Sequence, residues 1–173
     1  MLSRRQKHIN LKFFSLFSVV RGYNILVVVI AQYLASIYIF APYKTIKAVV
    51  FDAYGTLFDV AGAARQAATE PGQEALAALW PRLAEDWRRK QLEYTWLRAI
   101  TGHHVDFRQV TGDGLDWAME AQALSDPALR NRLMALYDAL PAYDEVPSML
   151  KTLKTQGFAT AILSNGSPAM LSS

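Results

Sequence analysis

The 173-residue chain contains no cysteine. This absence excludes a disulfide bond, a thiolate nucleophile and a cysteine-ligated metal site, and it leaves the redox compartment undetermined. The hydrophobic fraction is 52%, which is enough for a buried core. The length suits one ordinary domain, or a small domain with an appendage.

Acidic residues are also missing from the first 51 positions, which hold seven lysines and arginines. The other 11 basic residues are outnumbered by all 15 acids, so this larger part carries a charge of about −4. Because the positive charge belongs to the first segment alone, the net charge of +3 gives no reason to expect nucleic-acid binding.

A long apolar run covers residues 25–41, where only Gln32 and Ser36 are strongly polar. Its 17 residues reach the lower end of the range of roughly 17–25 that a membrane-spanning helix needs. The basic residues before the run suit a membrane anchor or a signal-like segment. A buried helix fits less well, because the run has no polar face. We therefore expect a hydrophobic helix here, and membrane contact, if there is any, through residues 25–41 only.

A strand-like segment, Lys47–Phe51, leads directly into Asp52 and a sharp turn at Gly55 and Thr56. In open α/β sheets, ligands bind beyond the carboxyl ends of the parallel strands. A carboxylate at that position can act as a covalent nucleophile or as a metal ligand. An aspartate after a strand can also simply begin a turn. On the local sequence alone, both roles for Asp52 stay open.

Residues 62–140 have the apolar spacing of helices. The first helix ends at Gly102 and carries a stripe of large side chains: Leu76, Leu79, Leu83 and Trp87. We expect a second helix over residues 114–124. A third starts at Asp126 and Pro127, a good N-cap followed by a favoured first-turn proline.

The last part of the chain returns to alternating helix and strand. Residues 147–156 suit a helix closed by Gly157, and residues 158–163 suit a short strand that ends at Ser164 and Asn165. A hydroxyl and an amide at a strand tip can orient a neighbouring carboxylate and donate hydrogen bonds to a substrate. Taken alone, the same residues also fit an ordinary turn.

Two of these segments together resemble motifs of the haloacid dehalogenase superfamily. The strand, Asp52 and the following Gly-Thr-Leu resemble the first motif, and Leu163–Pro168 resembles the second. Phosphatases of the superfamily carry a second aspartate two residues after the nucleophile, where this chain has Tyr54. A phenol, with a pKa of about 10, is a poor acid at neutral pH. The resemblance therefore points to the L-2-haloacid dehalogenases rather than to magnesium-dependent phosphoryl transfer.

The segment Trp87–Arg98 is similar to the cap helix of the same dehalogenases. The resemblance implies an α/β fold, with a Rossmann-like parallel sheet that is incomplete here and an inserted helical cap domain. The core would comprise residues 45–61 and 141–173, and the cap residues 62–140. Residues 1–43 would be a hydrophobic, basic-flanked leader or a possible transmembrane helix.

The resemblance also implies roles for individual residues. Asp52 would be the nucleophile, oriented by Ser164 and Asn165, with Thr56 in the same turn. Arg88 would bind the substrate carboxylate or the departing halide, because a guanidinium stays charged and presents a fork of donors. Four further residues would contact the substrate: Tyr54, Leu92, Trp96 and Phe107. The aromatic side chains among them can equally belong to the core.

The implied reaction is hydrolytic dehalogenation of L-2-haloalkanoic acids to D-2-hydroxy acids through an aspartyl ester. It needs no metal and no organic cofactor, and His103 and His104 stand in an expected loop without a matching ligand cluster. The protein would meet its small 2-haloacid substrate in the cytoplasm, and relatives of this type are commonly homodimers. Two alternatives stay open: a phosphatase of the same superfamily, and a membrane-tethered, catalytically inactive module.

Residues 1–43 weakly resemble the beginning of UbiA-type prenyltransferases, through Arg21 and Asn24 before the apolar run. The match lacks every aspartate-rich motif of that family, so we assign no prenyl transfer. The change of character near Tyr43 suggests an unrelated leader or a joined reading frame. In dehalogenases of this type, a lysine of the third motif and a later acidic motif would follow beyond Ser173. We therefore expect little or no turnover from this chain.

Overall fold

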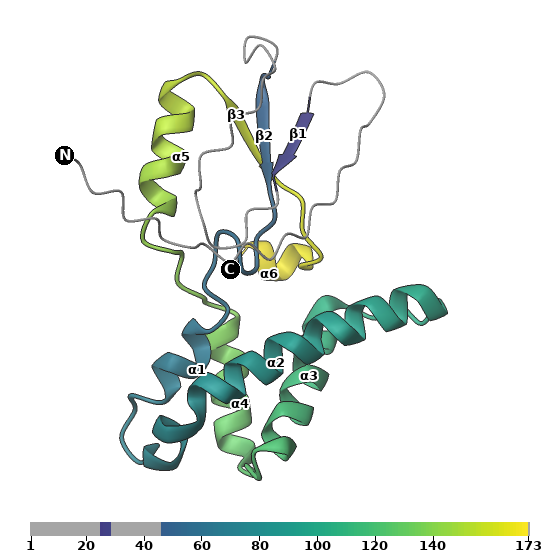
Figure 1. Ribbon diagram of the computed structural model, residues 1–173, viewed down its shortest axis with the longest axis vertical. Coiled ribbons are helices and arrows are strands. Elements are labelled where there is room, and N and C mark those ends of the chain that lie inside the picture. Colours follow the sequence, from purple (N-terminus) through teal and green to yellow (C-terminus); the bar gives the residue numbers. More distant parts are fainter. Residues whose placement is uncertain (1–24, 29–45, 173) are drawn as a thin grey trace, which may run out of the picture.

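The computed structural model describes residues 25–28 and 46–172, in which helices and strands alternate (Figure 1). The strands are β1 (Ile25–Val28), β2 (Ala48–Phe51) and β3 (Ala159–Ile162). The helices are α1 (Gly62–Ala67), α2 (Glu74–Thr101), α3 (Phe107–Ala121), α4 (Pro127–Tyr137), α5 (Val146–Thr155) and α6 (Pro168–Ser172).

The strands form one parallel sheet in the order β1-β2-β3. β2 is central, with Phe51 opposite Val28 of β1 and Ile162 of β3. All three strands therefore end at the same edge of the sheet, and the chain leaves β2 at this edge into Asp52. The α/β fold with a small parallel sheet, expected from the sequence, is confirmed.

Strand β1 corrects the expectation of a helix for residues 25–28, because these four residues pair with Ala48–Phe51. Isoleucine and valine favour strands, and the edge of β2 offers unpaired backbone groups to a parallel partner. A short apolar run cannot be assigned to helix or strand by periodicity alone. Residues 29–41, and the UbiA-like Arg21 and Asn24, lie outside the described residues. Among the helices that the structure describes, none is long and apolar enough to cross a membrane.

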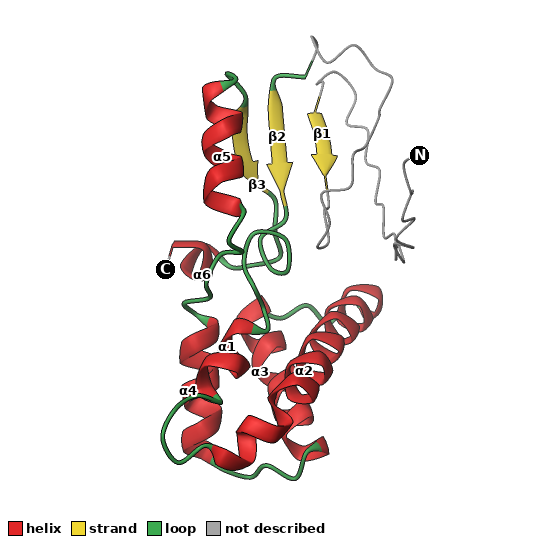
Figure 2. Ribbon diagram, turned by 60° about the vertical axis from the view of Figure 1, so that its left-hand side comes forward, coloured by secondary structure: helices red, strands yellow, loops and turns green. Residues whose placement is uncertain are grey.

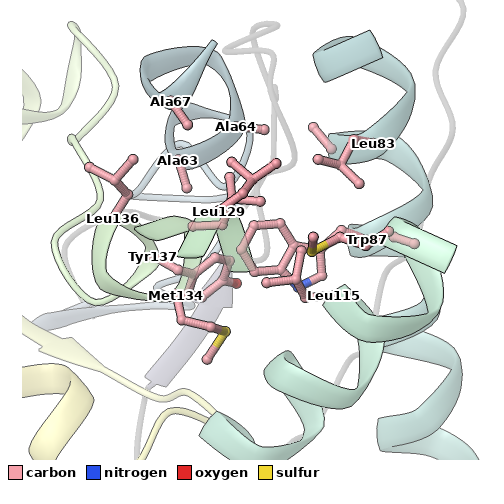
Figure 3. Close-up of a cluster of buried hydrophobic side chains, with 14 of the residues drawn as sticks. Ala63, Ala64, Ala67, Leu83, Trp87, Leu115, Leu129, Met134, Leu136 and Tyr137 are labelled. Carbon is pink, nitrogen blue, oxygen red and sulfur yellow. The ribbon is translucent and has the colours of Figure 1, made fainter. Parts of the chain in front are cut away.

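Helices α1 to α4 form a bundle that lies beyond the carboxyl ends of the strands (Figure 2). α2 packs along α3, and α1 packs against α4. The core of the bundle consists of large buried side chains (Figure 3): Leu83, Trp87, Leu115, Leu129 and Tyr137. Burying each such side chain contributes about 1.5–3 kcal/mol. This bundle carries α2, and with it Arg88, to the sheet edge where Asp52 lies.

The helix ends follow the capping residues that the sequence offers. α2 ends where Gly102 adopts a φ of +74°, and Asp126 caps α4 with its side chain, both as expected. The expected start of the intervening helix is wrong, because α3 begins at Phe107 rather than at Gly114. The side chain of Asp106 caps it, a signal that the apolar pattern did not reveal.

Helix α5 lies beside β3, and its side chains pack with residues of β2. Phe51, Leu57 and Val146 form a second, smaller buried cluster there. β3 is exposed along its length, and Ile162 and Leu163 are 47% and 65% exposed. Phe51 at the end of β2 is therefore buried, whereas the side chains of β3 are exposed.

Two buried glycines of α3 form a matched pair for testing the contact between α2 and α3. A Cβ at Gly114 would lie 3.0 Å from the backbone nitrogen of Gln91, whereas one at Gly112 would meet the flexible end of Arg130 at 3.2 Å. Because alanine is favoured over glycine in helices, we expect Gly112→Ala to raise the free energy of unfolding by up to about 1 kcal/mol. Gly114→Ala should lower it by roughly 1–3 kcal/mol, because α2 must move. Urea unfolding measures both, and equal effects would contradict the close helix contact.

Candidate active site

Asp52 follows the last residue of β2 and begins a tight turn. The carbonyl oxygen of Ala53 accepts hydrogen bonds from the amides of Leu57 and Phe58 at 2.9 and 3.0 Å. Gly55 has a φ of +85°, a left-handed conformation that favours glycine. The turn holds the Asp52 side chain partly buried at the edge of the sheet.

Arg88 reaches this turn from α2. Its Nη2 donates to the carbonyl oxygen of Tyr54 at 2.8 Å, and its Nη1 donates to Oε1 of Gln91 at 2.9 Å. A Cβ at Gly55 would lie 3.2 Å from Nη2, so the glycine leaves room for the guanidinium. The helical bundle thus places a positive charge against the turn that carries Asp52.

The surroundings of Asp52 act on its ionisation in opposite directions. Burial raises the pKa of the carboxyl, because the charged form loses water. Three groups lower that pKa in part: the backbone amide of Ala53, the positive charge of Arg88 and the side chain of Ser164. The arrangement combines reduced hydration with donors that favour the charged form, which suits a carboxylate nucleophile.

The tip of β3 completes the edge of the sheet. The side chain of Ser164 lowers the pKa of Asp52, and its hydroxyl oxygen accepts from the amide of Gly166 at 3.2 Å. Gly166 lies so close to Tyr54 that a Cβ would be 2.8 Å from the ring. Asn165, which lies between Ser164 and Gly166 in the sequence, is exposed. The parallel pairing of β2 with β3 therefore joins the two sequence motifs.

The ring of Tyr54 points into the helical bundle. It stacks on Tyr137 of α4 with 5.6 Å between ring centroids, and it lies 5.5 Å from Phe107 of α3. Burial raises the pKa of Tyr54, and it raises the pKa of Tyr137 to about 12. Both phenols are therefore neutral at pH 7. A neutral phenol at position 54, packed against two other rings, is a poor substitute for the acid that a second aspartate would supply.

The other residues predicted for the site are spread more widely. Thr56 lies in the turn after Asp52, and Leu92 is partly buried on α2, one turn beyond Arg88. Trp96 lies farther along the same helix and is 55% exposed. The structure brings together five of the predicted residues: Asp52, Tyr54, Arg88, Phe107 and Ser164.

Sequence reasoning missed a buried polar network beside Arg88. Gln91, on α2, donates through Nε2 to Oγ1 of Thr111 at 2.6 Å and to the hydroxyl of Tyr137 at 3.0 Å. The sequence does hold a signal for this network. Gln91 follows Trp87 by four residues and Arg88 by three, so it lies on the same face of the helix as both. A polar side chain on such a buried stripe must find partners.

No group of three or more acidic or histidine side chains that could hold a metal ion gathers within the described residues. His103 and His104 lie in the loop between α2 and α3, as expected. A polar groove between α3 and α4 is lined by Arg108 and Arg130 among others, and it contains none of the residues around Asp52.

A family model described as haloacid dehalogenase-like hydrolase matches residues 46–172. The chain belongs to this family. One relative, (S)-2-haloacid dehalogenase 1 of Pseudomonas sp. strain CBS-3, is 45% identical over 129 residues, which are 73% of this chain and 54% of the relative. (S)-2-haloacid dehalogenase 4A of Burkholderia cepacia is 42% identical over 128 residues, 73% of this chain and 53% of the relative.

Solved structures of dehalogenases share the fold of this chain. L-2-haloacid dehalogenase from Xanthobacter autotrophicus, with chloropropionic acid covalently bound, gives a TM-score of 0.61 at 39% identity, over 73% of this chain and 49% of that one. A crystal structure of another dehalogenase gives 0.67 at 41% identity, over 74% and 55%. The chain thus spans about half the length of the dehalogenases it matches.

The burial of Asp52 predicts that this family member is more stable without the charge. The pKa of Asp52 is higher in the folded state than in the unfolded state, so the ionised carboxylate lowers the free energy of unfolding above the folded pKa. Protonation removes this cost as the pH falls through the folded pKa. We therefore expect Asp52→Asn to raise the free energy of unfolding at pH 7. The gain should shrink as the pH falls towards about 4, the pKa of an unfolded aspartate.

Asp59→Asn is the matched control for this measurement. Asp59 lies in the same loop, and its carboxylate pairs with Arg65 at 2.7 Å and accepts from the amide of Ala61 at 3.0 Å. Its loss should leave stability unchanged or lower it. Urea unfolding of both variants between pH 4 and 8 gives the comparison. A fall in stability at pH 7 for Asp52→Asn would contradict the cost assigned to burial.

Proposed function

We propose that Asp52 is the nucleophile of a site that dehalogenates L-2-haloalkanoic acids through an aspartyl ester. The observation that carries the proposal is the combination at the end of β2, where a partly buried carboxylate adjoins Arg88 and the neutral ring of Tyr54. Similarity to (S)-2-haloacid dehalogenases supports it. The chloropropionic acid covalently bound in the Xanthobacter autotrophicus structure supports a covalent step.

In the proposed reaction, an oxygen of ionised Asp52 attacks C2 of the substrate from the side opposite the halogen. The new carbon–oxygen bond forms as the carbon–halogen bond breaks, and the halide leaves with the bonding electrons, so that C2 is inverted. Water then attacks the aspartyl carbonyl and cleaves the ester. The products are a D-2-hydroxy acid, a halide and a proton, and Asp52 is regenerated as a carboxylate.

Arg88 is suited to bind anions at this site. Within the described residues, two of its five N–H donors are engaged, by the Tyr54 carbonyl and by Gln91. The others can bind the substrate carboxylate or the departing halide. The charge of Arg88 also favours the ionised form of Asp52. One guanidinium can therefore bind the anionic substrate and keep the nucleophile charged.

The remaining residues would shape the site and orient the nucleophile. Tyr54 and Phe107 offer an aromatic wall for the alkyl group and the halogen. Ser164 would orient the Asp52 carboxyl, and Asn165 would donate to the substrate from the tip of β3. Three further residues stay predictions: Thr56, Leu92 and Trp96.

We further propose that residues 62–140 act as a cap over a core of residues 45–61 and 141–173. The position of the bundle beyond the strand ends supports this division (Figure 2). The contact between Arg88 and the Tyr54 carbonyl supports it as well. Such a cover limits the access of water, which strengthens electrostatic interactions at the reacting centre.

Incubation of the purified chain with L-2-chloropropionate tests the first step. We expect a covalent adduct on Asp52 by peptide mass spectrometry, with an equal amount of chloride released. Asp52→Asn should lower the rate of adduct formation at least about a thousandfold, as replacement of a nucleophile does in other enzymes. Asp59→Asn, in the same loop, should react like the unchanged chain.

Two results would contradict this assignment. The first is an adduct that forms as fast in Asp52→Asn as in the unchanged chain. The second is magnesium-dependent hydrolysis of p-nitrophenyl phosphate without any reaction with the haloacid, which would indicate a phosphatase.

A further inference from the structure

Gln91 is an amide side chain buried inside the helical bundle, on the face of α2 that meets α3 and α4. It is 1% exposed. Buried amides in proteins are almost always hydrogen-bonded, because an unpaired one loses its bonds to water without replacement. Gln91 has partners on three elements, and one of them is Arg88.

The contacts of Gln91 determine which way its amide points. The hydroxyl of Thr111 donates its single proton to the carbonyl of Phe107 at 2.8 Å. Oγ1 of Thr111 must then accept from Gln91, whose Nε2 lies 2.6 Å away. The amide nitrogen therefore faces Thr111, and Oε1 faces Nη1 of Arg88 at 2.9 Å. The hydroxyl of Tyr137 lies beside the same amide, 3.0 Å from Nε2 and 3.3 Å from Oε1.

The network connects Arg88 to the bundle at one end and to the Asp52 turn at the other. Nη1 is held by Gln91, and Nη2 is held by the carbonyl oxygen of Tyr54 at 2.8 Å. A planar guanidinium that is held at two nitrogens has a fixed orientation, so its remaining N–H donors point in fixed directions.

We propose that Gln91 is a positioning residue, which holds the Arg88 guanidinium in the orientation that ester formation at Asp52 requires. This inference rests on the proposed function, because the step that Gln91 would aid is the proposed ester formation at Asp52. Without Gln91, Arg88 keeps its charge near the substrate and loses its fixed direction. A misplacement of about 1 Å can lower an enzymatic rate about a hundredfold. Loss of Gln91 therefore acts on the rate constant more than on substrate binding.

Gln91→Met tests the proposal, because methionine has a similar volume and cannot replace these hydrogen bonds. We expect the limiting rate constant for adduct formation with L-2-chloropropionate to fall about 10- to 100-fold. The half-saturating concentration should change by less than about threefold. In an Arg88→Lys background, Gln91→Met should have little further effect, because the two residues act through one contact.

Leu83→Ala is the matched control for a purely structural role. Leu83 is 0% exposed on the same helix, and its truncation leaves a cavity away from Arg88. At a temperature where circular dichroism shows both variants folded, Leu83→Ala should retain the rate constant. Equal losses in Gln91→Met and Leu83→Ala would overturn the positioning role.

Nitrogen-15 NMR of the Arg88 guanidinium gives a readout that does not need the reaction. We expect distinct, slowly exchanging Nη–H signals in the unchanged chain and in Leu83→Ala, and their loss in Gln91→Met. Persistence of these signals in Gln91→Met would overturn the inference. If the signals are lost as expected but the unchanged chain forms no adduct, the proposed reaction fails, while the hold of Gln91 on Arg88 is upheld.

Discussion

A hydrogen bond from Nη2 of Arg88 to the carbonyl oxygen of Tyr54 holds the helical bundle against the turn that carries Asp52. The donor is charged and the contact is partly buried, which makes it stronger than an ordinary surface hydrogen bond. The guanidinium fits because Gly55 has no side chain. Neither the bundle nor the sheet contains the site by itself. The site exists where α2 meets the end of β2.

This contact also sets the electrostatics of Asp52. Burial raises the pKa of the carboxyl, and the groups that lower it come from the turn, from α2 and from the tip of β3. A fully hydrated carboxylate is shielded by water and attacks carbon slowly, whereas one buried without donors becomes protonated. Between these limits, Arg88 and Ser164 favour the ionised form of a partly buried Asp52. One side chain, Arg88, therefore both joins the bundle to the turn and favours the charged form of the carboxyl.

Local patterns in the sequence predicted much of this structure. Asp52 and Ser164 were expected at the ends of two strands, and the parallel pairing of β2 with β3 confirms the strands that carry them. Gly102 and Asp126 revealed helix ends, because caps depend on neighbouring backbone groups. Gln91 was not found, since its partners lie 20 and 46 residues away, on two other helices. An apolar stripe shows which face of a helix is buried but does not show what that face meets.

Strand β1 is another element that local sequence patterns did not predict, and its pairing with β2 helps to hold the turn at Asp52 in place. Ile25–Val28 lies outside the family-matched residues, yet it pairs with all four residues of β2. With β3 on the other side, β2 has both edges paired. Strands with unpaired edges open more readily than those bonded on both sides. The backbone of Phe51 is therefore held from two directions, and the turn at Asp52 starts from a fixed point. The proposed backside attack on carbon needs such accuracy, because its rate depends on the alignment of the reacting atoms.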